Sequence, residues 1–113
     1  MENCIFCKIV NGELPSTKLY EDENILAFKD ISPATPVHIL IIPKQHIESA
    51  KDIDSTNSVL VAKCFEVIAK LGKELNLDNG YRIINNCGKD GGQIVPHLHF
   101  HLLGGIQLNE KIV

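Results

Sequence analysis

The run from His97 to Leu103 constrains the fold more than any other part of the chain, because histidines and apolar residues alternate along it. A β-strand sends successive side chains to opposite faces and rises about 3.3 Å per residue. We therefore expect a strand over His97–Leu103, with three histidines about 7 Å apart along one face. The opposite face is apolar and is expected to pack under a helix; its residues are Leu98, Phe100 and Leu102.

The remaining patterns predict one domain over residues 1–113. Apolar residues recur at spacings of three and four from Ser55 to Leu77, which predicts one long helix. Ser55 or Thr56 can cap the start of this helix, and the turn sequence Asp78-Asn79-Gly80 is expected to end it. The expected strands are Thr17–Glu21, Asn24–Lys29, Val37–Ile42, Tyr81–Asn85 and His97–Leu103. This order predicts an α+β domain with a mostly antiparallel five-stranded sheet, Val37–Ile42 near its centre and the helix on one face.

Composition narrows the classes of function. The chain has 113 residues and a formal net charge of -3, and no cluster of Lys and Arg forms a basic stripe. This argues against a general nucleic-acid binder. No apolar run is long enough for a membrane span, and the N-terminus lacks the pattern of a signal peptide. We therefore expect a cytoplasmic protein, in which the four cysteines stay reduced.

The three clustered histidines indicate a catalytic or metal-binding site. A neutral imidazole can bind a metal, move a proton or attack phosphorus, because its ordinary pKa of about 6.5 leaves a lone pair available near pH 7. The glycine-rich loop Gly88–Gly92 precedes the histidines, and backbone N–H groups in such a loop, Gly92 included, can approach a phosphate closely. Asn86 and Gln93 can donate hydrogen bonds to phosphate oxygens. A plain connection between two strands remains the alternative for this loop.

Cys4 and Cys7 have the spacing with which two thiolates grip one zinc ion. A redox pair of this spacing is expected in a βαβ unit, whereas this pair precedes every predicted strand. Zinc is therefore the better interpretation, with two free thiols as the alternative.

The run Gly91–Gly105 resembles the histidine triad (HIT) superfamily, and its end, Leu103-Gly104-Gly105, is similar to the Hint branch of nucleotide-binding proteins. Leu26–Pro33 and Ile42–Ile47 carry the same resemblance, which extends from Cys4 to about Gln107. The resemblance implies a HIT-like fold with an additional short N-terminal helix. It also implies a homodimer.

The resemblance further implies a hydrolase or transferase that acts at the α-phosphate of purine nucleotides, either nucleoside phosphoramidates or dinucleotide polyphosphates. In the family, the histidine at the position of His99 is the nucleophile, and water then releases the nucleoside monophosphate from the nucleotidyl-histidine. His101 and His38 match histidines that line the phosphate site, Asn86 matches a phosphate contact, and Asp30 matches the acid that holds the ribose. The positions that match the purine pocket are Ile5, Phe6, Ile9, Phe28, Ile31 and Leu40. The implied zinc ligands are Cys4, Cys7, His46 and His97.

Two departures bear on the leaving group. Many Hint relatives have a polar residue where Ile94 stands, and many end in a Trp-containing tail, whereas this chain has no Trp.

Two other functions stay open. One is a metal-dependent hydrolase with the triad histidines as ligands. The other is a nucleotide sensor without catalysis.

Overall fold

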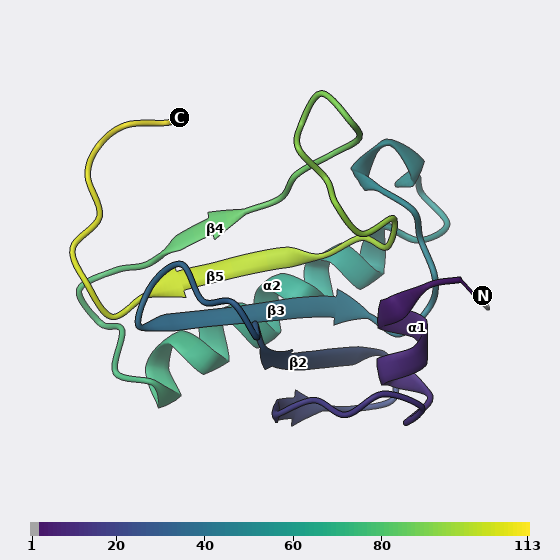
Figure 1. Ribbon diagram of the computed structural model, residues 1–113, viewed down its shortest axis with the longest axis horizontal. Helices are drawn as coiled ribbons and strands as arrows, with labels where there is room; N and C mark the ends of the chain where they lie inside the picture. The colour runs from purple at the N-terminus through teal and green to yellow at the C-terminus, as the bar shows by residue number, and fades with distance from the viewer. Residues whose placement is uncertain (1–2) are drawn as a thin grey trace.

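A computed structural model describes residues 3–113 of the chain (Figure 1). Within them, five strands form one sheet in the order β1-β2-β3-β5-β4, and every neighbouring pair is antiparallel. The elements are α1 (Ile5–Val10), β1 (Lys18–Glu21), β2 (Ile25–Lys29), β3 (Val37–Pro43), a 3₁₀ turn (Ala50–Asp52), α2 (Ser58–Glu74), β4 (Arg82–Ile84) and β5 (Phe100–Gly104). The α+β prediction is confirmed, including the long helix, the short N-terminal helix and the central position of β3.

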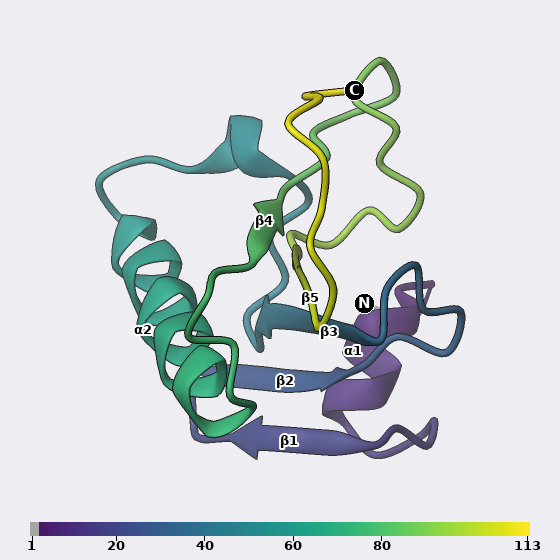
Figure 2. The ribbon, with the colours of Figure 1, turned by 90° about the vertical axis from the view of Figure 1, so that its left-hand side faces the viewer.

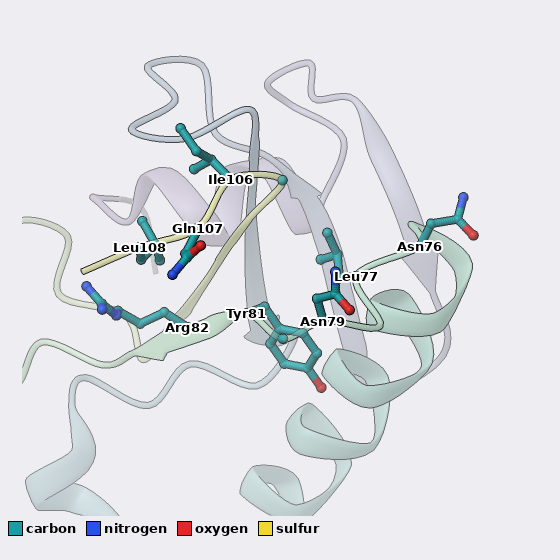
Figure 3. Close-up of a pocket in the computed structure, with 10 residues that line it drawn as sticks. Asn76, Leu77, Asn79, Tyr81, Arg82, Ile106, Gln107 and Leu108 are labelled. Atoms are coloured by element: carbon teal, nitrogen blue, oxygen red, sulfur yellow. The ribbon is translucent and has the colours of Figure 1, made fainter. Parts of the chain in front are cut away.

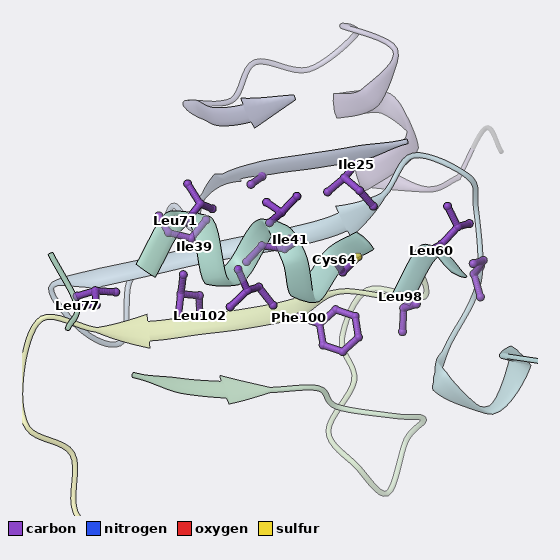
Figure 4. Close-up of a cluster of buried hydrophobic side chains, with 14 residues drawn as sticks. Ile25, Ile39, Ile41, Leu60, Cys64, Leu71, Leu77, Leu98, Phe100 and Leu102 are labelled. Atoms are coloured by element: carbon purple, nitrogen blue, oxygen red, sulfur yellow. The ribbon is translucent and has the colours of Figure 1, made fainter. Parts of the chain in front are cut away.

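The two helices lie on opposite faces of the sheet, as Figure 2 shows. Helix α2 covers the main core (Figure 4), and this side includes Leu98, Phe100 and Leu102, as predicted. Cys64 lies in the same core and is fully buried, as its place in the apolar stripe of the helix indicates. A second buried cluster lies on the face that carries α1 and consists of Cys4, Phe6, Cys7, Ile9, Leu26, Phe28, Leu40 and Ile42. The triad histidines are therefore directed toward the α1 side.

The ends of α2 differ from the prediction. The N-cap residue is Asn57 rather than Ser55 or Thr56, and its side chain makes no capping bond. Asp54 explains this, because its carboxylate accepts hydrogen bonds from the backbone N–H and the hydroxyl of Thr56 and holds that residue in the preceding turn. At the other end, Asn76 adopts φ 60°, and the N–H of Leu77 donates to the Gly72 carbonyl at 2.8 Å. The helix therefore stops before Asp78-Asn79-Gly80, because asparagine tolerates the left-handed conformation.

The strand that carries the last triad histidine is shorter than predicted. β5 begins at Phe100 rather than His97, and β4 covers only Arg82–Ile84. Residues 97–99 are held by other partners: the N–H of Leu98 donates to the Ile47 carbonyl, and the side-chain amide of Asn85 donates to the His99 carbonyl at 2.9 Å. These hydrogen bonds take the place of backbone hydrogen bonds between residues 97–99 and β4. In residues 3–113, no helix combines the length and apolarity needed to cross a bilayer.

Candidate active site and metal centre

His99 occupies the centre of the site with a defined tautomer. Its Nδ1 lies 2.7 Å from the His97 carbonyl oxygen, which can only accept, so Nδ1 carries the proton and Nε2 carries the lone pair. The ring packs edge-on against Phe6, with ring centroids 5.1 Å apart. Burial lowers the pKa of His99, which keeps the imidazole neutral near pH 7. A neutral ring with its lone pair on Nε2 is the form that a nucleophilic histidine requires.

His101 and His38 form a second pair beside His99. Nε2 of His38 lies 2.9 Å from Nδ1 of His101, and the Asp30 carboxylate lies 3.4 Å from the same Nε2. The His99 and His101 ring centroids are 5.1 Å apart. The other oxygen of Asp30 accepts the N–H of Ser32 at 2.8 Å, so the carboxylate is anchored at the start of the loop between β2 and β3. The structure thus brings together Asp30, His38, His99 and His101, as the sequence indicated.

The loop of residues 86–93 uses its side-chain donors internally. The Asn86 amide donates to the Gly91 carbonyl at 2.7 Å. Gln93 donates to the carbonyls of Glu48 and Val95 and accepts the N–H of Gly88. The N–H of Gly92, whose φ is 80°, donates to the Lys89 carbonyl. In this structure these groups shape the loop, and Gln93 ties it to the segment that carries His46; the link to Glu48 was not foreseen from the sequence.

Four of the residues predicted for the purine pocket lie in the buried cluster beneath α1, namely Phe6, Ile9, Phe28 and Leu40. The two others are at the surface: Ile5 is 52% exposed and Ile31 is 97% exposed. Phe6 also lies edge-on to His97, with ring centroids 5.8 Å apart, and so connects α1 to two triad rings. Sequence reasoning missed this second role, because nothing in the spacing of Phe6 signals it.

Cys4, Cys7, His46 and His97 converge at the end of the sheet nearest α1, with their ligand atoms all within 4.8 Å of one another. Nδ1 of His97 lies 3.3 Å from the sulfur of Cys4 and 3.5 Å from that of Cys7, and Nδ1 of His46 lies 3.3 Å from the sulfur of Cys7. A tetrahedral zinc with ordinary bond lengths separates sulfur and nitrogen ligands by about 3.6 Å. The Pro43 carbonyl lies 2.8 Å from Nε2 of His97 and fixes the proton there, which leaves Nδ1 free to ligate.

The pKa shifts of the residues in this cluster also favour a bound cation. Burial, and then the neighbouring Cys4 thiol, raise the pKa of Cys7 to about 11, so a thiolate pair is costly here without a positive charge. Burial lowers the pKa of His97 to about 4, so its ring is neutral at pH 7. The residues therefore fit a closed four-coordinate zinc site.

A surface hollow of about 830 Å³ lies elsewhere, where β4 begins and β5 ends (Figure 3). Its lining comes from residues 76, 77, 79–82 and 105–108, and it contains none of the predicted site residues. The hollow has no convergent histidine, cysteine or carboxylate groups, so we place the chemistry at the triad rather than here.

Comparison with known proteins agrees with this geometry. The family model of the HIT domain matches residues 11–108. Protein HitA of Neisseria gonorrhoeae is 42% identical over 104 residues, which cover 92% of this chain and 97% of the relative. The solved structure of a HIT family hydrolase from Clostridium thermocellum is 50% identical with a TM-score of 0.98, covering 100% of this chain and 99% of that one. A histidine triad nucleotide-binding protein from Candida albicans is 36% identical with a TM-score of 0.82, covering 98% and 86%. The chain belongs to the HIT domain family.

Proposed function

We propose that this protein is a hydrolase or transferase that cleaves bonds at the α-phosphate of purine nucleotides through a covalent nucleotidyl-His99 intermediate. The observation that carries the proposal is the hydrogen bond from Nδ1 of His99 to the His97 carbonyl, which leaves the lone pair on Nε2. The likeness to a HIT family hydrolase and to a histidine triad nucleotide-binding protein supports the reaction class and the ligand class. Phosphoramidates and dinucleotide polyphosphates are the substrate types that we expect.

In the first step, Nε2 of His99 forms a bond to the α-phosphorus and the bond to the leaving group breaks. The ring then carries a positive charge, which the bond from Nδ1–H to the His97 carbonyl stabilises. In the second step, water attacks the same phosphorus, the bond between phosphorus and Nε2 breaks and its electron pair returns to the ring. The proton that the water loses passes to solvent, the nucleoside monophosphate is released and His99 is neutral again. We assign the ribose to Asp30 and the phosphate to Asn86, Gly92, Gln93, His38 and His101. The apolar residues assigned to the purine are Ile5, Phe6, Ile9, Phe28, Ile31 and Leu40.

We further propose that one structural zinc is held by Cys4, Cys7, His46 and His97, whose spacing supports it. When bound, the ion supplies positive charge that stabilises the two thiolates. Thiolate ligands fit the reducing conditions of the cytoplasm, where we expect the protein to act.

We also propose a homodimer, which the unpaired edge of β4 in residues 3–113 supports. A net charge of -3 supports small nucleotides over nucleic acids or membranes as partners.

A metal-dependent hydrolase is the second candidate, because Asp30, His38 and His101 also place their ligand atoms within 4.8 Å of one another. The backbone N–H of Ala34 disfavours it. This group donates to Nδ1 of His38, so the proton of a neutral His38 resides on Nε2, the atom that would have to ligate. A metal at this position would have to displace that proton.

Turnover of adenosine 5′-phosphoramidate to AMP tests the proposed function. We expect His99→Ala to lower the turnover number by a factor on the order of a thousand or more, because the covalent step is lost. AMP binding by calorimetry should remain within a few-fold, and thermal unfolding provides the control for folding. Acid quenching of the wild-type reaction should trap a protein species heavier by one nucleotidyl group, which His99→Ala lacks. Wild-type turnover in the variant would refute the assignment of the nucleophile, and wild-type protein that binds AMP without turnover would support a sensor instead.

A further inference from the structure

The backbone of His99 lies outside both registers that hold β5 in the sheet. The paired register between β3 and β5 ends at Ile41 and Phe100, and the register between β4 and β5 ends at Ile84 and His101. His99 therefore lies one residue beyond the last pair with β3 and two residues beyond the last pair with β4. The regular sheet alone does not fix the main chain of His99.

Asn85, the first residue after β4, supplies a contact in place of the sheet. Its side-chain amide donates to the His99 carbonyl at 2.9 Å. If β4 and β5 stayed paired, the register would place Asn86 opposite His99. The side-chain bond replaces that pairing, so the chain after β4 departs from β5 and enters the glycine-rich loop (Figure 1). Asn85 thus lets the two strands separate while it keeps the main chain of His99 tied to the end of β4.

The bond from Asn85 differs in kind from the other bonds of this segment. The N–H of Leu98 donates to the Ile47 carbonyl at 2.6 Å, which is a bond between main-chain groups. The His99 ring bonds to the main-chain carbonyl of His97 at 2.7 Å. The His99 carbonyl, in contrast, receives its proton from a side chain. A substitution of Asn85 therefore removes this bond without altering the main chain or the triad itself.

We propose that Asn85 is a positioning residue that holds the main chain of His99, and through it the imidazole, in place for attack. The role in turnover rests on the proposed function. A nucleophile has to be held close to attack geometry, and a displacement of about 1 Å can cost on the order of a hundredfold in rate. The bond to the His97 carbonyl limits rotation of the ring, and the bond from Asn85 limits movement of the carbonyl of the same residue. Asn85 also connects His99 to the start of the loop that we assign to the phosphate.

The contact can be measured in the resting protein without substrate. His99-Phe100 is the only His-Phe pair in the sequence, so ¹³C-carbonyl histidine and ¹⁵N-phenylalanine labels give one carbonyl–amide NMR signal for this peptide bond. We expect Asn85→Leu, which is similar in size but has no donor, to move this signal upfield and to shift the ring signals of His99. Asn57→Leu is the matched control, because the Asn57 amide donates to the Asp52 carbonyl at 3.0 Å, in the turn before α2. The control should leave both sets of signals unchanged.

Turnover of adenosine 5′-phosphoramidate separates positioning from a purely structural role. We expect Asn85→Leu to lower kcat roughly 10–100-fold with KM within about threefold, because Asn85 is not assigned to the substrate. Asn85→Gln keeps an amide donor and should exceed the leucine variant in kcat by at least about fivefold. Asn57→Leu should keep kcat within about twofold of wild type. Asn85→Ala replaces the leucine variant in both experiments if thermal unfolding shows that Asn85→Leu does not fold.

Unchanged carbonyl and ring signals in the folded donor-free variant would overturn the proposal, whether or not the protein hydrolyses nucleotides. A loss confined to KM, or a glutamine variant no faster than the leucine variant, would also overturn it. If the signals move as expected but the wild-type protein does not turn over adenosine 5′-phosphoramidate, Asn85 still holds His99 and the proposed function is wrong.

Discussion

At the scale of single residues, main-chain carbonyl groups fix the position of the proton on two of the three triad rings. The Pro43 carbonyl fixes the proton of His97 on Nε2, and the His97 carbonyl fixes that of His99 on Nδ1. The alternation in the sequence correctly indicated that these side chains share one face. It could not indicate which nitrogen carries each proton, because the acceptor for His97 lies 54 residues away, at the end of β3.

Asp30 offers a prediction at this scale. A carboxylate that accepts hydrogen bonds from the ribose hydroxyls contributes about 1.5–3 kcal/mol per bond. We expect Asp30→Ala to weaken binding of a ribonucleotide at least about tenfold more than binding of its 2′,3′-dideoxy analogue, as measured by calorimetry. Asp30→Asn serves as the matched control, because its side-chain oxygen can still accept the N–H of Ser32 and keep the loop turn. Equal losses for both nucleotides in Asp30→Ala would remove Asp30 from the ribose site.

At the scale of elements, the hairpin of β1 and β2 turns at Asp22, between the two strands expected from the sequence. Its carboxylate accepts the Tyr20 hydroxyl at 2.6 Å and the backbone N–H groups of Asn24 and Ile25 at 2.7 and 2.8 Å. The bond from Tyr20, followed by these backbone bonds, lowers the pKa of Asp22 below its ordinary 3.8. The folded protein therefore favours the ionised carboxylate.

The stability of this turn should follow pH in a defined direction. Because the folded pKa is depressed, the contribution of Asp22 is complete above its ordinary pKa and is lost as the pH falls through the folded value. We expect Asp22→Asn to lower the free energy of unfolding by about 1–3 kcal/mol at pH 7. Urea titrations should show the difference from wild type shrinking at pH 3. A difference that is the same at both pH values would contradict this account.

Gly91 cannot be replaced by a larger residue without disturbing the glycine-rich loop, a constraint that the sequence pattern did not indicate. A Cβ atom at Gly91 would lie 2.4 Å from the backbone oxygen of Cys87, and main-chain atoms cannot move aside as a flexible side chain can. We expect Gly91→Ala to distort the loop, costing about 1–3 kcal/mol of stability and lowering phosphoramidate turnover. Gly12→Ala is the matched control, because nothing lies within 4 Å of its added Cβ, although its φ of +80° adds local strain far from the loop in sequence. A Gly91→Ala protein with turnover equal to that of the control would show that the loop does not shape the site.

The limits of sequence-based prediction are clearest at element ends. Periodicity identified α2 and each strand, because burial of one face is a local pattern. It placed the start of β5 three residues early, because Leu98 pairs with Ile47 and the His99 carbonyl pairs with the side chain of Asn85. It placed the end of α2 at Asp78-Asn79-Gly80, because nothing local distinguishes Asn76 from its neighbours as the left-handed residue.

At the scale of the whole molecule, the cluster of Cys4, Cys7, His46 and His97 brings together residues from three distant segments: the N-terminal segment, the loop after β3 and the residues just before β5. A zinc ion held there, as proposed, would link these segments, and its binding free energy would add to the stability of the fold. His97 belongs to this cluster and also supplies the carbonyl that orients His99. Loss of the proposed zinc should therefore alter the position of His99 through a change in the structure.

We expect protein purified without chelator to contain about one zinc per chain, as measured by elemental analysis. Cys4→Ser/Cys7→Ser should lose the metal, with a lower melting temperature and reduced activity as a consequence. Cys87→Ser is the matched control, since Cys87 is a cysteine outside the cluster, and it should retain zinc. Less than about a tenth of an equivalent of any transition metal, with reduced thiols, would defeat the zinc proposal. Zinc retained in the double variant would place the metal at another site and favour the metalloenzyme alternative.

Main-chain groups fix which nitrogen of His38, His97 and His99 carries the proton, and this affects how the protein tolerates amino-acid substitutions. Substitution alters side chains but leaves carbonyl and N–H groups in place, so the groups at Pro43, His97 and Ala34 persist as long as the fold does. Ile5, Ile31 and Ile94, in contrast, are exposed and make few demands on packing. Under the proposed function, directed evolution of new substrate preferences can therefore randomise these three isoleucines while His99 keeps its lone pair on Nε2.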